Sequence, residues 1–259
     1  MRRLWRWGRA MSELVDDLVA ALDPVRFAAG LGFTAEPWQS GLLRSPSRRV
    51  LVTCARQVGK TQTTSLKALH LAVYTPGALV LIISPSQRQS DEMLLRVKAL
   101  YRGLGRAKPS KDSGSELVLE NGSRIVSLPG TEGTSRGFSA AQLIVLDEAS
   151  RVDDDIFASV LPMVASDGAI WALSTPWGRR GWFFELHEDE RSGWERHKVT
   201  VYESAQYDAE RIAEMRATVG SFAFASDYLC EFGDTDSQLF GSELVRAAFS
   251  PAVEPLELP

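Results

Sequence analysis

The chain has 259 residues, of which 44% are hydrophobic and 24% are charged, and its formal net charge is -4 at pH 7. This content suffices for a full hydrophobic core, and no stretch approaches the roughly 18 uncharged apolar residues of a membrane span. Cys54 and Cys230 have no metal-like spacing, which argues against a disulfide framework or a zinc site and makes a reducing cytoplasm the expected compartment. The net charge does not exclude nucleic acid, because a basic contact can be confined to one face.

Two short helices are expected near the N-terminus. Residues 14–22 repeat apolar side chains at helical spacing, and Asp23-Pro24 is typical of the start of a second helix. Residues 33–39 follow, just ahead of the first core strand. There the Gln39 amide can pair with the edge of adenine and Trp38 can supply an apolar wall, although ordinary packing explains most such pairs.

A strand, a loop and a helix come next, in the order that a phosphate-binding loop requires. Residues 50–53 are an apolar run typical of a buried strand, and residues 62–74 predict a helix. The intervening Cys54-Ala55-Arg56-Gln57-Val58-Gly59-Lys60-Thr61 resembles G-x-x-x-x-G-K-[ST], in which backbone N–H groups cradle phosphates. This pattern assigns Lys60 to phosphate and Thr61 to Mg²⁺, while Cys54 stands where the pattern has glycine.

A second apolar strand is predicted over residues 78–83, followed by a helix that places Met93, Leu94 and Val97 toward the core. The opposite face of this helix and the loop beyond it are expected to be basic. Two interpretations stay open for this basic cluster, either a solvated helix face or a contact with DNA phosphates. The cluster consists of Lys98, Arg102, Arg106, Lys108 and Lys111.

Residues 115–119 and 123–128 flank Asn121-Gly122, which predicts a hairpin with a type I′ turn. A glycine-rich connection containing Arg136-Gly137 leads to a third buried strand over residues 143–146, which ends in Asp147-Glu148. The three acids at 153–155 fit the N-terminus of a helix better than a metal site.

A fourth strand is predicted over residues 169–173, ending in Ser174-Thr175-Pro176, and a fifth over 198–201. Strands that alternate with helices predict an α/β fold with a mainly parallel sheet flanked by helices. From residue 209 the pattern is helical and indicates a small lid. We therefore expect an N-terminal helical extension over 1–22, a core over 23–203, and a helical lid with its tail over 204–259.

The carboxyl ends of parallel strands meet at one edge, where α/β sheets bind ligands. Asp147 is then expected in the Mg²⁺ shell and Glu148 as the general base that activates water. Hydrolysis also needs positive charge at the γ-phosphate. Arg56 lies inside the loop and can act only in cis, whereas Arg136 is suited to reaching a neighbouring subunit.

Taken together, Trp38-Gln39, the loop from Arg56 to Thr61, Arg136-Gly137, Leu146-Asp147-Glu148-Ala149 and Ser174-Thr175-Pro176 resemble the ATPase domain of the large terminase subunit of tailed bacteriophages. The resemblance covers approximately residues 23–240. It includes the arginine-bearing loop that lacks the first glycine, so Cys54 fits the family pattern.

This resemblance implies a P-loop NTPase of the additional-strand, catalytic-glutamate type that hydrolyses ATP and drives double-stranded DNA into a procapsid. It implies ATP contacts from Trp38, Gln39 and the loop Arg56, Gln57, Val58, Gly59, Lys60, Thr61 and Gln62, with Ser174, Thr175 and Pro176 coupling hydrolysis to motion and Arg136 acting in trans. The implied partners are a homo-oligomeric ring, with a pentamer expected, a portal protein and a small terminase subunit, at the portal in the host cytoplasm, with no membrane. The stretch after Phe240 is too short for the family's nuclease domain, so no nuclease activity is expected.

Two other functions remain open. A superfamily 2 helicase-like DNA-dependent ATPase shares the Trp-Gln and Asp-Glu features, but it needs a second sheet domain that residues 209–259 cannot form. A non-hydrolysing ATP-gated DNA-binding module has no use for a base at Glu148. Strand displacement and multiple-turnover phosphate release, respectively, separate these functions from a packaging motor.

Overall fold

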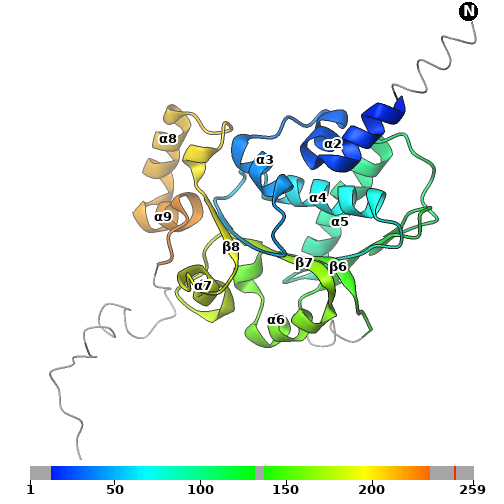
Figure 1. Cartoon of the computed structure of the whole chain (residues 1–259). Helices are drawn as coiled ribbons and strands as arrows, with labels where there is room; N and C mark the ends of the chain where they lie inside the picture. The colour runs from blue at the N-terminus through cyan, green and yellow to red at the C-terminus, as the bar shows by residue number, and fades with distance from the viewer. Residues whose placement is uncertain (1–12, 132–136, 234–247, 249–259) are drawn as a thin grey trace, which may run out of the picture.

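The protein is described here by a computed structural model, which covers residues 13–131, 137–233 and 248 (Figure 1). Its centre is an eight-stranded sheet in the order β3-β4-β5-β2-β6-β7-β1-β8. All neighbouring strands pair in parallel except β3 with β4 and β4 with β5, which are antiparallel. The strands are β1 (Arg49–Cys54), β2 (Leu79–Ser84), β3 (Lys111–Ser113), β4 (Glu116–Val118), β5 (Arg124–Pro129), β6 (Ala141–Asp147), β7 (Val164–Ser174) and β8 (Glu195–Val199).

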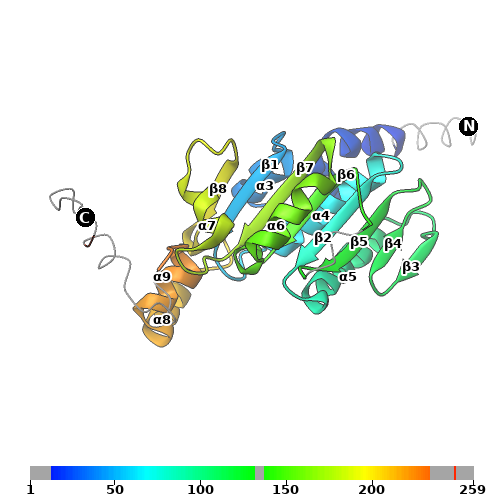
Figure 2. The ribbon, with the colours of Figure 1, turned by 90° about the horizontal axis from the view of Figure 1, so that it is seen from below.

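Helices cover both faces of this sheet. Figure 1 shows α2 to α5 above the sheet and α6 and α7 below it, while α8 and α9 lie beyond the β8 edge (Figure 2). Residues 13–22 are also helical. The labelled helices are α2 (Pro24–Gly30), α3 (Pro37–Arg44), α4 (Lys60–Tyr74), α5 (Gln87–Gly103), α6 (Asp154–Val160), α7 (Gly181–Glu188), α8 (Ala209–Val219) and α9 (Ser221–Leu229), with 3₁₀ turns η1 (Ala149–Arg151), η2 (Leu161–Met163) and η3 (Val201–Glu203).

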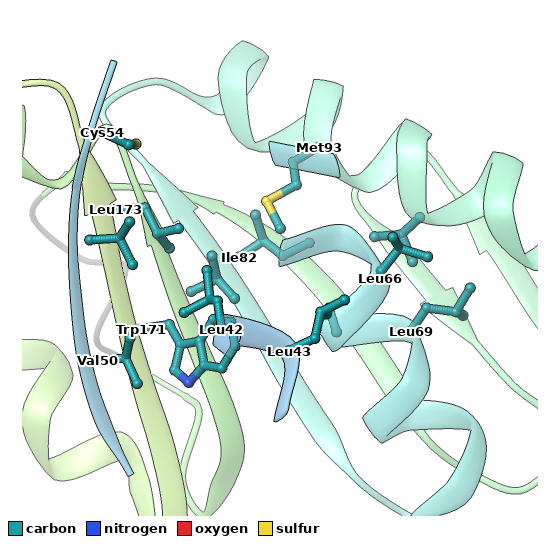
Figure 3. Close-up of a cluster of buried hydrophobic side chains, with 14 of the residues drawn as sticks. Leu42, Leu43, Val50, Cys54, Leu66, Leu69, Ile82, Met93, Trp171 and Leu173 are labelled. Atoms are coloured by element: carbon teal, nitrogen blue, oxygen red, sulfur yellow. The ribbon is translucent and has the colours of Figure 1, made fainter. Parts of the chain in front are cut away.

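The sheet separates two hydrophobic cores because successive strand side chains point to opposite faces. On β1, Val50 and Val52 belong to the core beneath α4 and α5, whereas Leu51 belongs to the core beside α6 and α7. Trp171 of β7 is fully buried in the first core (Figure 3). Burial on both faces explains why the central strands appear in the sequence as continuous apolar runs.

The predicted strands and the parallel sheet are confirmed, with bounds that shift by a few residues. Asp23 caps α2 through a 2.9 Å bond from the Val25 N–H, as the Asp-Pro pair predicted. Three elements have no counterpart in the sequence predictions, namely α3, α7 and β3. Their short lengths give a weak periodic signal, and β3 forms by pairing with β4.

The hairpin between β4 and β5 is present, but the predicted type I′ turn is wrong. The Leu119 N–H donates to the Ser123 carbonyl over 2.8 Å, which closes a three-residue loop in which only Gly122 has a positive φ. A type I′ turn needs positive φ at two residues. The Asn121 side chain instead donates to the Ala72 carbonyl over 2.8 Å, which anchors the turn to the end of α4.

The predicted N-terminal helix is present, but its apolar stripe faces solvent. Leu14, Leu18 and Leu22 are all exposed, and the helix is held instead through Asp17, which accepts hydrogen bonds from Tyr74 and Arg106. Within the described part of the chain, no helix has the length and hydropathy to cross a membrane. Residues 1–12 and the tail after 248 lie outside the described residues.

Candidate nucleotide-binding site

Three polar segments meet at the carboxyl edge of the sheet. The loop after β1, Asp147 at the end of β6 and Ser174 at the end of β7 are brought together because β7 pairs with both β1 and β6. The register sets Thr53 beside Ser174 and Asp147 beside Leu173. The strand β7 is therefore an additional strand between the loop-bearing strand and the Asp-Glu strand.

Cys54 is part of β1 rather than of the loop, which explains why no glycine is needed at this position. Its side chain is fully buried, and burial raises the pKa of the Cys54 thiol to about 12, so the thiol stays neutral. Gly59, by contrast, has φ +94°. A Cβ built there would lie 2.8 Å from the Gln39 Nε2 atom, so both backbone conformation and space require glycine.

Lys60 begins α4 and its ammonium group lies between two carboxylates. It forms a short ion pair with Glu148 Oε1, and its Nζ atom is 3.8 Å from Asp147 Oδ1. The side chains of Lys60 and Asp147 are only 13% and 11% exposed. Burial alone would lower the pKa of Lys60, but the negative charges of Asp147 and Glu148 outweigh it and raise this pKa. Burial raises the pKa of Asp147 above its ordinary value, and Lys60 opposes this effect.

Glu148 has a left-handed backbone conformation, with φ 54° and ψ 41°. For a residue other than glycine this costs on the order of 1–2 kcal/mol, a strain that is typical of functional positions. The turn that follows is fixed by Ser150, whose hydroxyl lies 2.7 Å from Ser174 Oγ and donates to the Thr175 carbonyl over 2.9 Å. Glu148 is thus joined by one side chain to the Ser174-Thr175-Pro176 segment.

Thr61 and Asp147 offer the hard oxygen atoms that Mg²⁺ prefers. Both border a cavity of about 620 Å³ that Glu148 also lines. The described residues give the Thr61 hydroxyl no hydrogen-bond partner, so it is available to a ligand. Among them, no group of three or more His, Cys, Asp or Glu side chains could hold a metal alone, so phosphate and water oxygens would complete the shell of a cation. The residues present fit such an ion.

The lid helices also contact the loop. Arg56 Nε lies 2.8 Å from Asp227 Oδ2 of α9, and the Arg56 N–H donates to the Asp227 carbonyl over 2.9 Å. The Tyr207 hydroxyl donates to the Arg56 carbonyl over 2.9 Å. The sequence analysis missed Asp227 and Tyr207, because no local pattern marks a contact between segments so distant along the chain.

Gln39 is buried against the loop, with only 3% of its surface exposed. Its Oε1 atom accepts the Glu36 N–H over 2.9 Å, and the Trp38 Nε1–H donates to Glu36 Oε2 over 2.8 Å. Glu36 Oε1 in turn accepts the Ala205 N–H at the start of the lid. Trp38 and Gln39 therefore lie where α3, the loop and the lid converge, and their contact with adenine stays a prediction.

The predicted basic cluster is not one exposed face. Lys98 is 4% exposed and its Nζ atom lies 2.8 Å from Asp112 Oδ1, so naming it as a DNA contact was wrong. The physical reason is its position one residue after Val97 and three before Tyr101, within the buried stripe of α5. Arg106 pairs with Asp17 and Lys111 with Glu116, whereas Arg102 and Lys108 are exposed. Arg136 lies outside the described residues.

Known proteins resemble this chain in sequence and in structure. The family model for the terminase large subunit, T4likevirus-type, N-terminal, matches residues 51–246. The large terminase subunit of Thermus phage G20c is 26% identical over 182 residues, which is 62% of this chain and 37% of that protein. The chain thus spans little more than a third of the length of this curated relative.

Two solved structures show the same fold. The ATPase domain of the large terminase of Thermus phage P74-26 matches with a TM-score of 0.62 and 20% identity, over 80% of this chain and 97% of that domain. The large terminase of a thermophilic bacteriophage, solved in complex with ATP-gamma-S, matches with a TM-score of 0.60 and 10% identity, over 76% and 52%. The predicted α/β fold of a P-loop NTPase is therefore confirmed.

Proposed function

This chain belongs to the family of terminase large-subunit N-terminal domains, and we propose that it is an ATP-hydrolysing motor domain that drives double-stranded DNA into a viral procapsid. The observation that carries the proposal is Lys60, held between Asp147 and Glu148 at the carboxyl edge of the sheet. The family relationship supports the wider proposals, which are a homo-oligomeric ring, with a pentamer expected, a portal protein and a small terminase subunit as partners, and action at the portal in the host cytoplasm.

ATP binding would change the partner of Lys60. Its ammonium group leaves Glu148 and binds phosphate oxygens, and the N–H groups at the start of α4 cradle the phosphates. Thr61 and Asp147 would hold Mg²⁺, which neutralises charge on the phosphate oxygens when it is bound. Gln57, Val58, Gly59 and Gln62 complete the phosphate contacts, while Trp38 and Gln39 bind the adenine.

Release from Lys60 gives Glu148 its function as the general base. The freed carboxylate orients a water molecule toward the γ-phosphate and accepts its proton. Ser150 connects the Glu148 turn with Ser174 and Thr175, so a shift of Glu148 reaches Ser174-Thr175-Pro176. In this proposal residues 23–203 are the ATPase core, residues 204–259 are the lid and tail, and residues 1–22 are an extension.

The decisive experiment replaces Glu148 with Gln, which keeps the shape of the side chain and removes the base. We expect multiple-turnover phosphate release from the wild-type chain with Mg²⁺ and DNA, and a loss of at least about 100-fold in the variant, within the range for general-base catalysis. ATP binding should be retained. Turnover that survives the substitution refutes the base, and absence of turnover in the wild type favours an ATP-gated binding module. Strand displacement by this chain alone would favour the helicase-like alternative.

Arginines complete the proposed catalytic set. Arg136 acts on the active site of the neighbouring subunit, and Arg56 acts within its own. Mixing Arg136→Ala chains with Glu148→Gln chains tests the first role, because a trans-acting Arg136 restores ATPase activity that neither variant has alone. An assembled mixture without recovered activity would refute the trans role. Arg56→Ala, measured alone, tests the second.

DNA binding is proposed for the exposed part of the basic cluster, with Arg102 and Lys108 as the main contacts. Each lost phosphate contact should lower the salt slope of DNA binding by about one unit, for any sequence. Arg102→Ala and Lys108→Ala are the test variants, and Lys98→Met is the buried comparison. Unchanged slopes for both test variants would return this surface to ordinary solvation.

A further inference from the structure

Two arginines of α5, Arg88 and Arg96, border the same cavity as Thr61, Asp147 and Glu148. Both arginines are exposed, and the described residues offer neither of them an ion pair or a hydrogen bond. This separates them from Arg102 and Arg106 of the same region, which have acidic partners. Free arginines that open onto a cavity beside two carboxylates call for an anionic ligand.

The positive charge already present at the site is committed elsewhere. Lys60 faces both Asp147 and Glu148, and Arg56 pairs with Asp227. A triphosphate adds more negative charge than Lys60 and one Mg²⁺ ion can balance beside two carboxylates. Further positive charge is therefore needed at the outer end of the triphosphate, and the α5 side of the cavity supplies it.

The position of Arg88 along α5 favours it over Arg96. The helix begins directly after β2 and so starts at the carboxyl edge, where Ser86 caps it and accepts the Gln89 N–H through its side chain. Arg88 lies in the first turn, where the helix end adds partial positive charge. Arg96 lies eight residues further, about 12 Å along the axis at 1.5 Å per residue. Arg88 is thus level with the strand ends that carry Asp147.

We propose that Arg88 binds the γ-phosphate of ATP from the α5 side of the cavity, and that this contact lets the site distinguish ATP from ADP. The proposal rests on the proposed ATPase function and adds a residue to it. Arg88 makes ionic hydrogen bonds to γ-phosphate oxygens, which ADP lacks. Its loss therefore weakens the binding of the triphosphate and leaves that of the diphosphate unchanged.

The test compares the affinities of ATP-gamma-S and ADP by titration calorimetry with Mg²⁺ in wild type, Arg88→Ala, Arg88→Lys and Arg96→Ala. In Arg88→Ala we expect ATP-gamma-S to bind about tenfold more weakly, as for one lost charge-assisted contact, and ADP to bind as in the wild type. Arg88→Lys should recover part of the loss. Arg96→Ala, the matched variant on the same helix and cavity, should change both affinities by less than about twofold.

The possible failures are distinguishable. A wild-type chain that binds neither nucleotide refutes the proposed function and Arg88 with it. A wild-type chain that prefers ATP-gamma-S, together with an Arg88→Ala variant that keeps this preference or loses both affinities equally, refutes only the role of Arg88. Weaker DNA binding by Arg88→Ala, with nucleotide affinities unchanged, also overturns the proposal and assigns this arginine to DNA phosphate.

Discussion

The nucleotide site has one half built by the sheet and one half built by the lid, and the two halves are stabilised differently. In the sheet half, Lys60 and Asp147 project from the ends of core elements and are nearly enclosed. In the lid half, Arg56 is 50% exposed and its partner Asp227 is 27% exposed. Charges that are screened by water interact weakly, whereas enclosed charges interact strongly and are costly to separate.

The difference indicates a division of labour. The sheet half has a fixed geometry, because the backbones of β1, β6 and β7 are paired along their length. The lid half depends on a few contacts between side chains and backbone, including that of Tyr207 with Arg56. A part held by weak contacts is the part able to move during an ATPase cycle. The following predictions test whether the two halves differ as the structure indicates.

Removing the central cation of the sheet half should have the largest effect. Lys60→Met leaves Asp147 and Glu148 facing each other and removes the charge that binds phosphate. We expect ATP to bind at least about 100-fold more weakly, roughly 3 kcal/mol for a charge-assisted contact. Calorimetric titration measures this, with Lys108→Met as an exposed control. A change below about threefold would show that the sheet half does not depend on this charge.

The helix that carries Lys60 should give the sheet half its own pH dependence. Lys67 of α4 donates to the Leu43 carbonyl over 2.9 Å, and burial lowers the pKa of Lys67 to about 8. The unfolded chain, with an ordinary lysine pKa near 10.4, holds the proton more firmly. Between pH 8 and 10 the unfolded state therefore binds more protons, and the free energy of unfolding rises with pH.

This rise should be on the order of 2 kcal/mol. Urea denaturation at pH 8 and pH 10 measures it, and the Lys67→Met variant removes the contribution, so its curve should be flatter by that amount. Identical pH dependence in the two proteins would show that Lys67 keeps an ordinary pKa. The Arg56 pair in the lid half contributes no such slope, since arginine does not titrate in this range.

The lid half should respond weakly to the loss of one hydrogen bond. Tyr207→Phe removes the bond to the Arg56 carbonyl, and water can replace it at this partly exposed place. We expect a cost of about 1 kcal/mol, seen as faster hydrogen exchange in α8 with no change in α4. Tyr202→Phe is the matched control, because Tyr202 is exposed and the described residues give its hydroxyl no partner. Equal effects of both variants would deny the lid contact its role.

The same division decides what the sequence can predict. The strand ends that carry Lys60, Asp147 and Ser174 follow from buried apolar runs, because a parallel sheet aligns its carboxyl ends at one edge. The pairing of Arg56 with the lid does not follow, since Tyr207 lies 151 positions away and no periodic pattern encodes the contact. Lys98 shows a second limit, because a lysine inside an apolar stripe looks exposed until its buried partner is known.

Glu148 shows a third limit. The sequence indicates a carboxylate after the strand, but not the left-handed backbone that turns it toward Lys60. Such strain is imposed by the surrounding structure, here by Ser150 and its bonds to the next strand end. Sequence patterns therefore identify the chemical groups of the sheet half, while their orientation depends on tertiary contacts.

The smallest effect is expected from the ion pair of the lid half. Asp227→Asn removes the charge that faces Arg56, and a pair this exposed contributes under about 1 kcal/mol. Salt should imitate the substitution, because a Debye length of about 3 Å at 1 M screens exposed charges while buried ones are screened much less. Hydrogen exchange of α9 in the wild type should therefore become faster between 0.05 and 1 M NaCl, while exchange in α4 stays constant. In Asp227→Asn the α9 rate should already be high and insensitive to salt, whereas Glu210→Gln, an exposed acid of α8, should behave as the wild type. If salt accelerated exchange in both helices equally, the two halves of the site would be stabilised alike, and the contrast between an enclosed charge cluster and a screened lid contact would fail.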